Sequence, residues 1–325
     1  MHDLHVLPRV RDSLSYLYVE HCRIDQEAKA IAVHDANGKT PVPCASLTTL
    51  LLGPGTNITH AAIRALADNG CLVLWTGEEG VRMYAQGMGE TRSARNLLLQ
   101  ARLWADPAAH LEVVMRMYRM RFSEELAEGL TLQQIRGREG VRVREAYARA
   151  SRETGIPWRG RSYRSDDWSA SDPVNRALSS ANSCLYGVCH AAIVSLGYSP
   201  GLGFVHTGKM LSFVWDVADL YKADITIPLA FETAAEGSTN LETRVRRACR
   251  DRFNKSRMLQ RIAPDITYAL TGAGRRPAEG GSDIDRDPEL DVDLALPGGL
   301  WDPEVGAVQG GVNQADVATE PDEEG

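Results

Sequence analysis

Ala28-Lys-Ala-Ile-Ala-Val-His-Asp-Ala-Asn-Gly-Lys-Thr-Pro-Val-Pro-Cys44 is the stretch that first indicates how this chain folds. Its two ends, 28–34 and 41–44, are rich in the apolar and β-branched residues that are typical of strands. Between them, Asn37-Gly38 is a strong hairpin signal, because a type I′ turn needs positive φ at both central residues. The sequence therefore predicts an antiparallel hairpin here.

Further strand-like runs surround this hairpin. They lie at residues 14–20, 47–52, 71–76 and 81–85. One helix interrupts them at His60–Asp68, with Thr59 as its N-cap and Asn69-Gly70 as its left-handed end. Short strands at this spacing predict that residues 1–88 form a small β-sandwich-like domain.

After Gly89 the pattern changes to that of helices. Apolar residues recur at helical spacing over 93–105, 107–122, 131–154 and 173–196, and shorter helices are predicted at 211–221, 228–234, 241–261 and 265–270. Ser171-Asp172-Pro173 supplies a cap and a first-turn proline. We therefore predict an α+β protein in which residues 89–273 form a larger, all-α domain.

Charge divides the chain into a basic body and an acidic tail. Residues 277–325 hold fourteen Asp and Glu against one Arg, a net charge of −13, so the total of −7 leaves +6 for residues 1–276. Charge asymmetry of this kind is one indication of contact with nucleic acid. The composition of 274–325 predicts disorder. Leu290–Leu296, which alternates like a strand, and Trp301 could instead order on a partner.

Several functional classes find no support in the composition. The longest apolar runs are too short to span a bilayer, so no membrane contact is expected. Because the first residues lack the features of a signal peptide, we expect a cytoplasmic protein. The six cysteines form no CxxC pair, which favours free, mostly buried thiols. Neither an ATP-binding GxxxxGK[ST] loop nor a GxSxG nucleophile motif occurs.

Gln134-Ile-Arg-Gly-Arg-Glu-Gly-Val-Arg is the first segment that could carry chemistry. Arg136, Glu139 and Arg142 stand three residues apart, so Glu139 has a guanidinium about one helical turn away on either side. Gly137 and Gly140 each cost a helix up to about 1 kcal/mol, which suggests that something approaches the backbone closely there. Intrahelical salt bridges on a surface helix are the alternative.

A second group of candidate residues follows. His206 lies in the glycine-bounded loop Gly203-Phe-Val-His-Thr-Gly-Lys, and Asp216 and Asp219 lie one turn apart in the apolar helix after it. Carboxylates there need a compensating cation, which Mg²⁺ or Mn²⁺ could supply. Pairing with Lys222 and nearby arginines is the alternative. A metal would suit phosphodiester chemistry on DNA, since it activates the attacking oxygen without a covalent nucleophile.

In this order and spacing, these segments resemble the CRISPR-associated spacer-acquisition integrase, and specifically its type I-E branch. The resemblance covers about residues 8–272. It also includes Gly53-Pro-Gly-Thr, Thr59-His-Ala-Ala, Gly80-Val-Arg-Met-Tyr-Ala, Arg95-Asn-Leu-Leu, Ser183-Cys-Leu-Tyr-Gly-Val and Arg246-Arg-Ala-Cys-Arg-Asp. Any one of these matches is weak, whereas the ordered set is specific.

The resemblance implies an enzyme that joins the 3′-hydroxyl ends of a short foreign DNA duplex to the repeat array by transesterification. Glu139, His206 and Asp219 would be the metal ligands, with Asp216 as a further acidic residue of the site. The basic positions expected to hold phosphates are Arg82, Arg136, Arg161, Lys209, Arg246 and Arg250. Tyr163 and Tyr186 match aromatic positions near the DNA 3′ end.

The resemblance also implies a homodimer, with two dimers flanking a dimer of a small ferredoxin-like companion protein. Two positions depart from the pattern: His21 replaces an aromatic wedge, and Asn57 replaces an arginine on the DNA track. Two other functions stay open. One is a metal-dependent endonuclease on branched or single-stranded DNA, and the other is a structural DNA-binding subunit whose acidic residues form salt bridges only.

Overall fold

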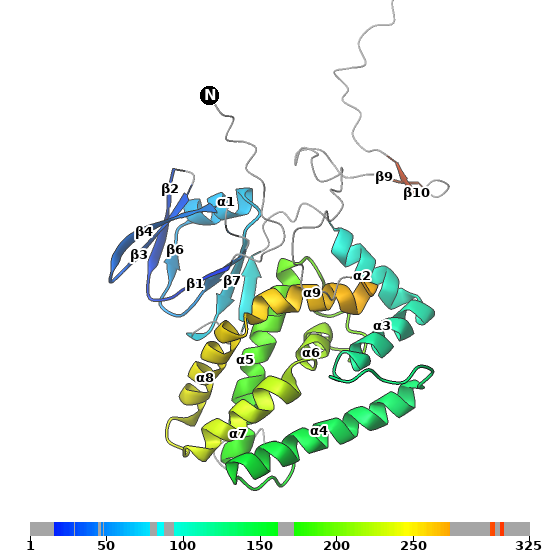
Figure 1. Ribbon diagram of the computed structural model, residues 1–325. Helices are drawn as coiled ribbons and strands as arrows, with labels where there is room; N and C mark the ends of the chain where they lie inside the picture. Colours follow the sequence, from blue (N-terminus) through cyan, green and yellow to red (C-terminus); the bar gives the residue numbers. More distant parts are fainter. Residues whose placement is uncertain are drawn as a thin grey trace, which may run out of the picture. The chain divides into compact units, whose positions relative to one another are not determined.

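The computed structural model describes residues 16–28, 30–44, 47, 49–78, 83–87, 94–161, 172–273, 300–302 and 306–308. Residues 1–276 form one compact unit, and residues 277–325 form a second. Within the first unit, a β-rich part precedes a larger helical part (Figure 1), as the sequence predicts.

The β-rich part contains two four-stranded sheets. In the first sheet, β1 (Tyr16–Val19), β5 (Thr49–Leu52) and β7 (Leu72–Thr76) are parallel, and β8 (Met83–Gly87) is antiparallel to β7. The second sheet has the order β4 (Gly38–Pro43), β3 (Ala30–Asp35), β2 (Arg23–Glu27) and β6 (Asn57–Ile58). The two departures noted in the sequence lie in this part of the chain: Asn57 starts β6, and His21 is exposed with its ring against Gly55.

The predicted hairpin is confirmed, since β3 and β4 pair antiparallel. The predicted turn is wrong by one residue: Asp35 pairs with Gly38, so Ala36 and Asn37 are the central residues, and of the predicted pair only Gly38 has positive φ. The sequence did not reveal β2, because Ile24 is the only aliphatic residue of Arg-Ile-Asp-Gln-Glu. That single side chain is fully buried, and β3 supplies the pairing partner. Helix α1 (His60–Asp68) begins and ends as predicted, with the Thr59 side chain accepting a hydrogen bond from the Ala62 N–H.

The helical part follows the predicted order. Its elements are α2 (Arg95–Ala105), α3 (Pro107–Arg119), α4 (Leu132–Thr154), α5 (Pro173–Ser195), α6 (Ser212–Ala218), the π-helix η4 (Lys222–Thr226), α7 (Ile227–Ala235), α8 (Leu241–Lys255) and α9 (Met258–Thr271). Helix α5 contacts α6, α7, α8 and α9. Figure 1 shows it crossing the middle of this part.

The prediction of one helix over 241–261 is wrong. The chain turns at Arg257, whose φ of 48° is left-handed, and α9 then runs through Pro264. Proline inside a helix removes one hydrogen bond of the helix. The burial of Met258, Ile262 and Ile266, which form a continuous face along α9, offsets the loss of that hydrogen bond.

The β-rich and helical parts share a small apolar cluster. It joins Leu51, Leu72 and Leu74 of the first sheet to Ala191 and Val194 of α5. Beside it, the hydroxyls of Thr49 and Ser195 lie 2.7 Å apart. This contact buries the C-terminal end of α5 against the sheet, and so ties the sheet to the core helix that also contacts α6.

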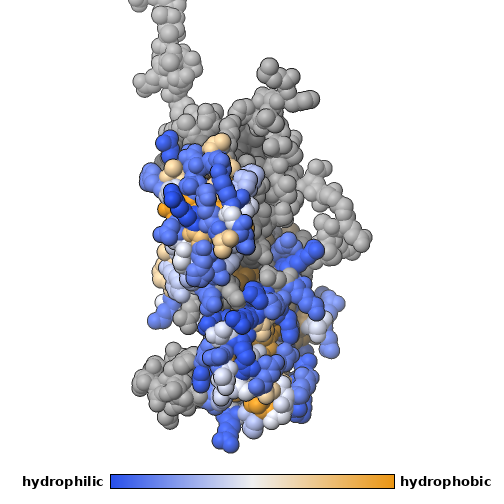
Figure 2. All heavy atoms as spheres, turned by 90° about the vertical axis from the view of Figure 1, so that its left-hand side faces the viewer, coloured by the Kyte–Doolittle hydropathy of each residue, from blue (hydrophilic) through white to orange (hydrophobic). Residues whose placement is uncertain are grey.

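Of the helices that the structure describes, α5 alone is long and apolar enough to cross a membrane, and most of it is buried in the core. A buried core helix explains this composition fully. Figure 2 shows that the face turned toward the viewer is mainly hydrophilic, with small apolar areas between hydrophilic side chains.

The acidic C-terminal region is described at two short strands only. There β9 (Leu300–Asp302) pairs antiparallel with β10 (Gly306–Val308), which places Trp301 opposite Ala307. The strand-like run Leu290–Leu296 lies outside the described residues.

Candidate active site

Glu139 is a nearly buried carboxylate on the long helix α4. The helix begins with a capping box, in which Thr131 and Gln134 exchange side-chain and backbone hydrogen bonds. Of the two arginines predicted to flank Glu139, Arg142 pairs with it, its Nε donating to Oε2 at 2.8 Å and its Nη2 to Oε1 at 3.2 Å. Arg136 instead donates to the Tyr118 hydroxyl at 3.3 Å. Of the two salt bridges that the spacing suggested, Arg142–Glu139 forms and Arg136–Glu139 does not.

The two glycines next to Glu139 border open space. A Cβ atom placed on Gly137 or Gly140 would meet no described protein atom within 4 Å. Packing within the described chain therefore does not require glycine at either position. The surface beside Glu139 is left open to a ligand that approaches the backbone.

His206 is held in place by Asp216. The Asp216 carboxylate is fully buried and accepts hydrogen bonds from the N–H groups of Phe204, Val205 and His206 at 2.6, 3.0 and 2.8 Å. Its Oδ1 also lies 2.7 Å from His206 Nδ1. The other ring nitrogen, Nε2, lies 3.8 Å from Oδ2 of Asp219. One imidazole thus contacts both carboxylates, in agreement with their predicted position on one helix face.

Asp219 ends α6 and pairs with Lys222, whose Nζ lies 2.6 Å from Oδ1. Lys222 begins the π-helix η4, an element that often occurs at functional sites. Burial alone would lower the pKa of Lys222, but Asp219 and Tyr186 outweigh it and raise the pKa above its ordinary value. The ammonium also lies 4.9 Å from the centre of the Tyr186 ring, so Tyr186 borders the site.

Arg121 joins the two carboxylates, and sequence reasoning missed it. Its side chain is 5% exposed, with Nη1 3.3 Å from Oε1 of Glu139 and Nη2 3.5 Å from Oδ2 of Asp219. The guanidinium also stacks on the Tyr118 ring at 4.7 Å. The buried Nε and Nη2 have no hydrogen-bond partner among the described residues. Arg121 stands in a run of alternating arginines and apolar residues, which gave no sign that this one alone turns inward.

The remaining predicted DNA-binding residues lie at different places. Arg161 donates to the Asn175 carbonyl and to the Ser179 hydroxyl at the start of α5. On α8, Arg246 pairs with Glu78 at 3.4 Å, and Arg250 pairs with Asp251 at 2.8 Å. Lys209 is exposed in the loop after His206. Arg82 and Tyr163 lie outside the described residues.

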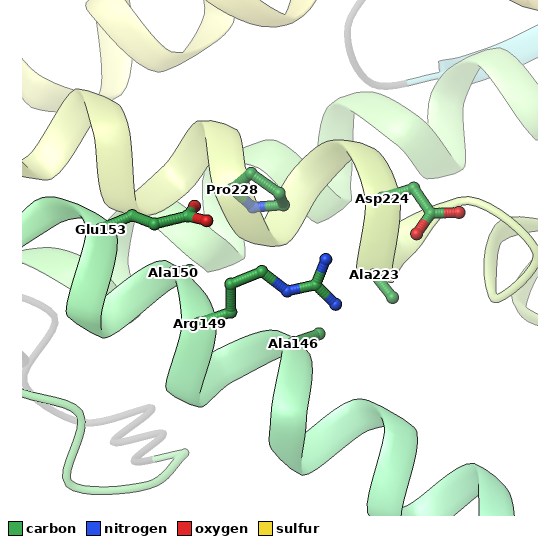
Figure 3. Close-up of a pocket in the computed structure, with 7 residues that line it drawn as sticks. All are labelled: Ala146, Arg149, Ala150, Glu153, Ala223, Asp224 and Pro228. Carbon is green, nitrogen blue, oxygen red and sulfur yellow. The ribbon is translucent and has the colours of Figure 1, made fainter.

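A separate pocket of about 220 Å³ lies where α4 meets η4 and α7. Figure 3 shows Arg149 extending across it, with Glu153 on the same helix and Asp224 on the far side. None of the predicted site residues lines this pocket. The candidate site is therefore the ion-pair network around Arg121, and not this pocket.

This network brings together residues that are far apart in the sequence. Glu139 comes from α4, Asp219 from the end of α6, His206 from the preceding loop and Arg121 from the end of α3. Two carboxylates and one imidazole are donors that Mg²⁺ and Mn²⁺ accept. Here Arg121, Arg142 and Lys222 neutralise the carboxylates. Among the described residues, no three acidic, imidazole or thiol groups already lie close enough to share one ion.

Comparisons with known proteins identify relatives along most of the chain. The family model "CRISPR associated protein Cas1" matches residues 15–125 and 117–250. The CRISPR-associated endonuclease Cas1 2 of Thermus thermophilus is 59% identical over 95% of this chain and 93% of its own length. The CRISPR-associated endonuclease Cas1 of Escherichia coli is 41% identical over 82% of this chain and 88% of its own length.

Solved structures agree with these relatives. The crystal structure of a TtCas1–DNA complex superimposes with a TM-score of 0.76 and 61% identity over 82% of this chain and all of that chain. A casposase bound to its integration product shares the fold alone, with a TM-score of 0.54, 15% identity, and coverage of 80% of this chain and 96% of that one. The chain belongs to the Cas1 family of CRISPR-associated endonucleases.

Proposed function

We propose that this chain is a metal-dependent DNA integrase of CRISPR adaptation, of the type I-E branch. It joins the 3′-hydroxyl ends of short foreign DNA duplexes to the repeat array by phosphodiester transesterification, and it has endonuclease activity. The single observation that carries this proposal is that Arg121 connects Glu139 with Asp219, while the His206 imidazole lies against Asp219. The relative solved as a TtCas1–DNA complex supports DNA as the substrate.

Glu139, His206 and Asp219 would hold the metal, because carboxylate and imidazole donors suit Mg²⁺ or Mn²⁺. The three groups would have to come closer together, since Arg121 now lies between the two carboxylates. When bound, the ion polarises the phosphoryl oxygens and lowers the pKa of the attacking hydroxyl. Asp216 holds His206 through Nδ1, which leaves Nε2 facing Asp219. Such a second carboxylate orients a ligand imidazole and fixes its tautomer. The role of Asp216 is therefore to position His206.

In the reaction, the 3′-oxygen of the captured strand bonds to a phosphorus of the repeat, whose own 3′-oxygen leaves and takes a proton. The hydroxyl proton passes to solvent or to a neighbouring base. Arg121, Arg142 and Lys222 balance the charge of the two carboxylates in the buried site. Open space beside Gly137 and Gly140 leaves room for a DNA backbone next to Glu139.

We place the DNA on the basic residues predicted for it. Exposed Arg136 and Lys209 lie on the elements that carry Glu139 and His206, and Tyr186 contacts Lys222 beside the site. This DNA-binding surface would extend over the other predicted residues, Arg82, Arg161, Tyr163, Arg246 and Arg250. The proposal includes a homodimer in the cytoplasm, with two dimers bound to a dimer of a small ferredoxin-like companion.

Hydrolysis is the second candidate, because the relatives carry the name endonuclease. Water would then replace the 3′-hydroxyl as the nucleophile. One assay separates the two: the protein and its companion are incubated with Mn²⁺, a labelled duplex with 3′-hydroxyl ends, and a supercoiled plasmid that carries a repeat. Label joined to the plasmid supports integration, whereas nicking without joining supports the nuclease. Unchanged activity in His206→Ala and Asp219→Ala would refute the site.

A further inference from the structure

Helix α2 contacts the segment before His206 through polar side chains. Asn96, Gln100 and Trp104 stand four residues apart, so they form one stripe along the helix. The stripe donates to four backbone carbonyls between Leu196 and Gly203: Asn96 Nδ2 to Leu196 at 2.7 Å, Gln100 Nε2 to Ser199 and Leu202 at 3.0 Å each, and Trp104 Nε1 to Gly203 at 3.1 Å. The Ser199 N–H returns a hydrogen bond to Gln100 Oε1 at 2.7 Å.

Gln100 is the only fully buried residue of α2. A helix that served only to cover the core would bury apolar side chains instead. A buried amide is costly unless its hydrogen bonds are made, and Gln100 makes three of them with the connecting segment. The buried face of α2 therefore binds the backbone of the segment before His206 through specific hydrogen bonds.

His110, in the first turn of α3, continues the stripe. Its Nδ1 lies 3.0 Å from the Trp104 carbonyl oxygen, and its Nε2 lies 2.9 Å from the Phe204 carbonyl oxygen. A carbonyl oxygen only accepts, and a neutral imidazole has one donor. A neutral ring therefore donates to one of these two carbonyls. The ring also packs against the Phe204 ring, with centroids 5.1 Å apart.

The loop that carries His206 is thus held from two sides. On one side, Trp104 donates to the Gly203 carbonyl, and His110 Nε2 lies 2.9 Å from the Phe204 carbonyl oxygen. On the other side, Asp216 accepts from the N–H groups of 204, 205 and 206. The space is tight, because a Cβ on Gly203 would overlap the His206 carbonyl oxygen and the Ser212 Cβ. A shift of α2 would therefore move the loop and its imidazole.

We propose that Gln100, Trp104 and His110 are positioning residues for His206. They fix the backbone of Gly203–His206 against Asp216 and hold the imidazole beside Asp219. This inference rests on the proposed function for its effect on DNA joining. We call these contacts of Gln100, Trp104 and His110 with the segment before His206 the brace. The brace is present in the protein without metal or DNA, so it can be measured separately from DNA joining.

The test compares Trp104→Phe, which removes one donor and keeps a ring, and Trp104→Phe/His110→Ala with a control, Leu98→Ala. Leu98 is 66% exposed on α2 and outside the stripe. Hydrogen exchange of the amides of 204–206 is measured without metal, and single-turnover joining is measured with Mn²⁺. We expect exchange to be about tenfold faster in the double variant. Joining should fall about fivefold in Trp104→Phe and about 20-fold in the double variant. Duplex affinity and melting temperature should match the control.

Unchanged amide exchange in both variants would overturn the brace, whatever the activity. Faster exchange with unchanged joining would overturn the positioning role. If the parent protein does not join DNA at all, the proposed function fails, and amide exchange alone then decides whether the brace exists. If the joining rate falls no further in the two variants than in Leu98→Ala, α2 contributes only general stability, which also contradicts the inference.

Discussion

Oδ1 of Asp216 lies 2.7 Å from Nδ1 of His206, and the same carboxylate accepts three backbone N–H groups of the His206 loop. Both oxygens of Asp216 are therefore engaged within the protein. This arrangement gives different roles to the two aspartates, which the helical spacing alone presented as an equivalent pair. Asp216 fixes the loop, whereas Asp219 faces the other ring nitrogen and the arginine that connects it to Glu139.

Asp216→Asn should reduce both stability and activity. An amide cannot accept hydrogen bonds at its nitrogen, so at least one buried N–H loses its partner. We expect the free energy of unfolding to fall by about 2–3 kcal/mol and DNA joining to fall about 10–100-fold. Urea denaturation and a joining assay measure these effects. An unchanged joining rate in a folded variant would contradict the positioning role.

Arg121→Met should make stability depend on divalent metal. Without the guanidinium, Glu139 and Asp219 face each other with less positive charge in a buried site. We expect a loss of about 3–5 kcal/mol of unfolding free energy in chelator, part of which Mn²⁺ restores. Melting temperatures with EDTA and with Mn²⁺ test this. Arg119→Met, on the exposed face of α3, is the matched control. Equal metal dependence in both variants would refute the prediction.

The stability of the protein should fall in alkali partly through Cys71. Burial raises the pKa of Cys71 to about 12, whereas an unfolded cysteine titrates near pH 8.5. The unfolded thiol therefore loses its proton before the folded one does. As pH rises from about 8.5 toward 12, the free energy of unfolding falls by up to about 1.4 kcal/mol per pH unit. Denaturant unfolding between pH 7.5 and 10.5 should show a shallower decline in Cys71→Ala. If the free energy of unfolding falls equally with pH in the parent protein and in Cys71→Ala, Cys71 does not cause the loss of stability.

Thiol reagents should react slowly with the native protein. All six cysteines are free and buried, as the sequence indicated. Burial also raises the pKa of Cys22 and Cys44. Because the thiolate is the reactive form, we expect little modification at pH 7.5 in an hour, and six modified cysteines after denaturation. Intact-mass spectrometry counts them. Rapid modification of the folded protein would show that a cysteine is accessible.

Residues 1–276 should bind duplex DNA more tightly than the full chain. This part carries a net charge of +6 and is a compact unit, whereas 277–325 carries −13. Acidic residues compete with phosphates for the same arginines. Binding measured at 50, 100 and 200 mM salt should show the largest difference at low salt. Equal affinities at low salt would mean that the acidic region does not compete.

The sequence by itself determined the local structure. Asn37-Gly38 located the hairpin, although the turn itself lies one residue earlier. Thr59 and Asn69-Gly70 bounded α1, and Asp172-Pro173 marked the start of α5. Each of these signals acts within a few residues, through backbone conformation or a cap. The order of the family segments also pointed to Glu139, His206 and Asp219 before any contact was known.

Only the tertiary structure decided which charges meet. Arg121 and Glu139 are 18 residues apart, and packing of α3 against α4 joins them. Nothing local distinguishes Arg121 from the arginines around it, because the choice depends on which helix face the core buries. The same holds for Trp104 and His110, whose partners lie 99 and 94 residues away. Long-range packing selects these contacts, and so it determines the geometry around His206.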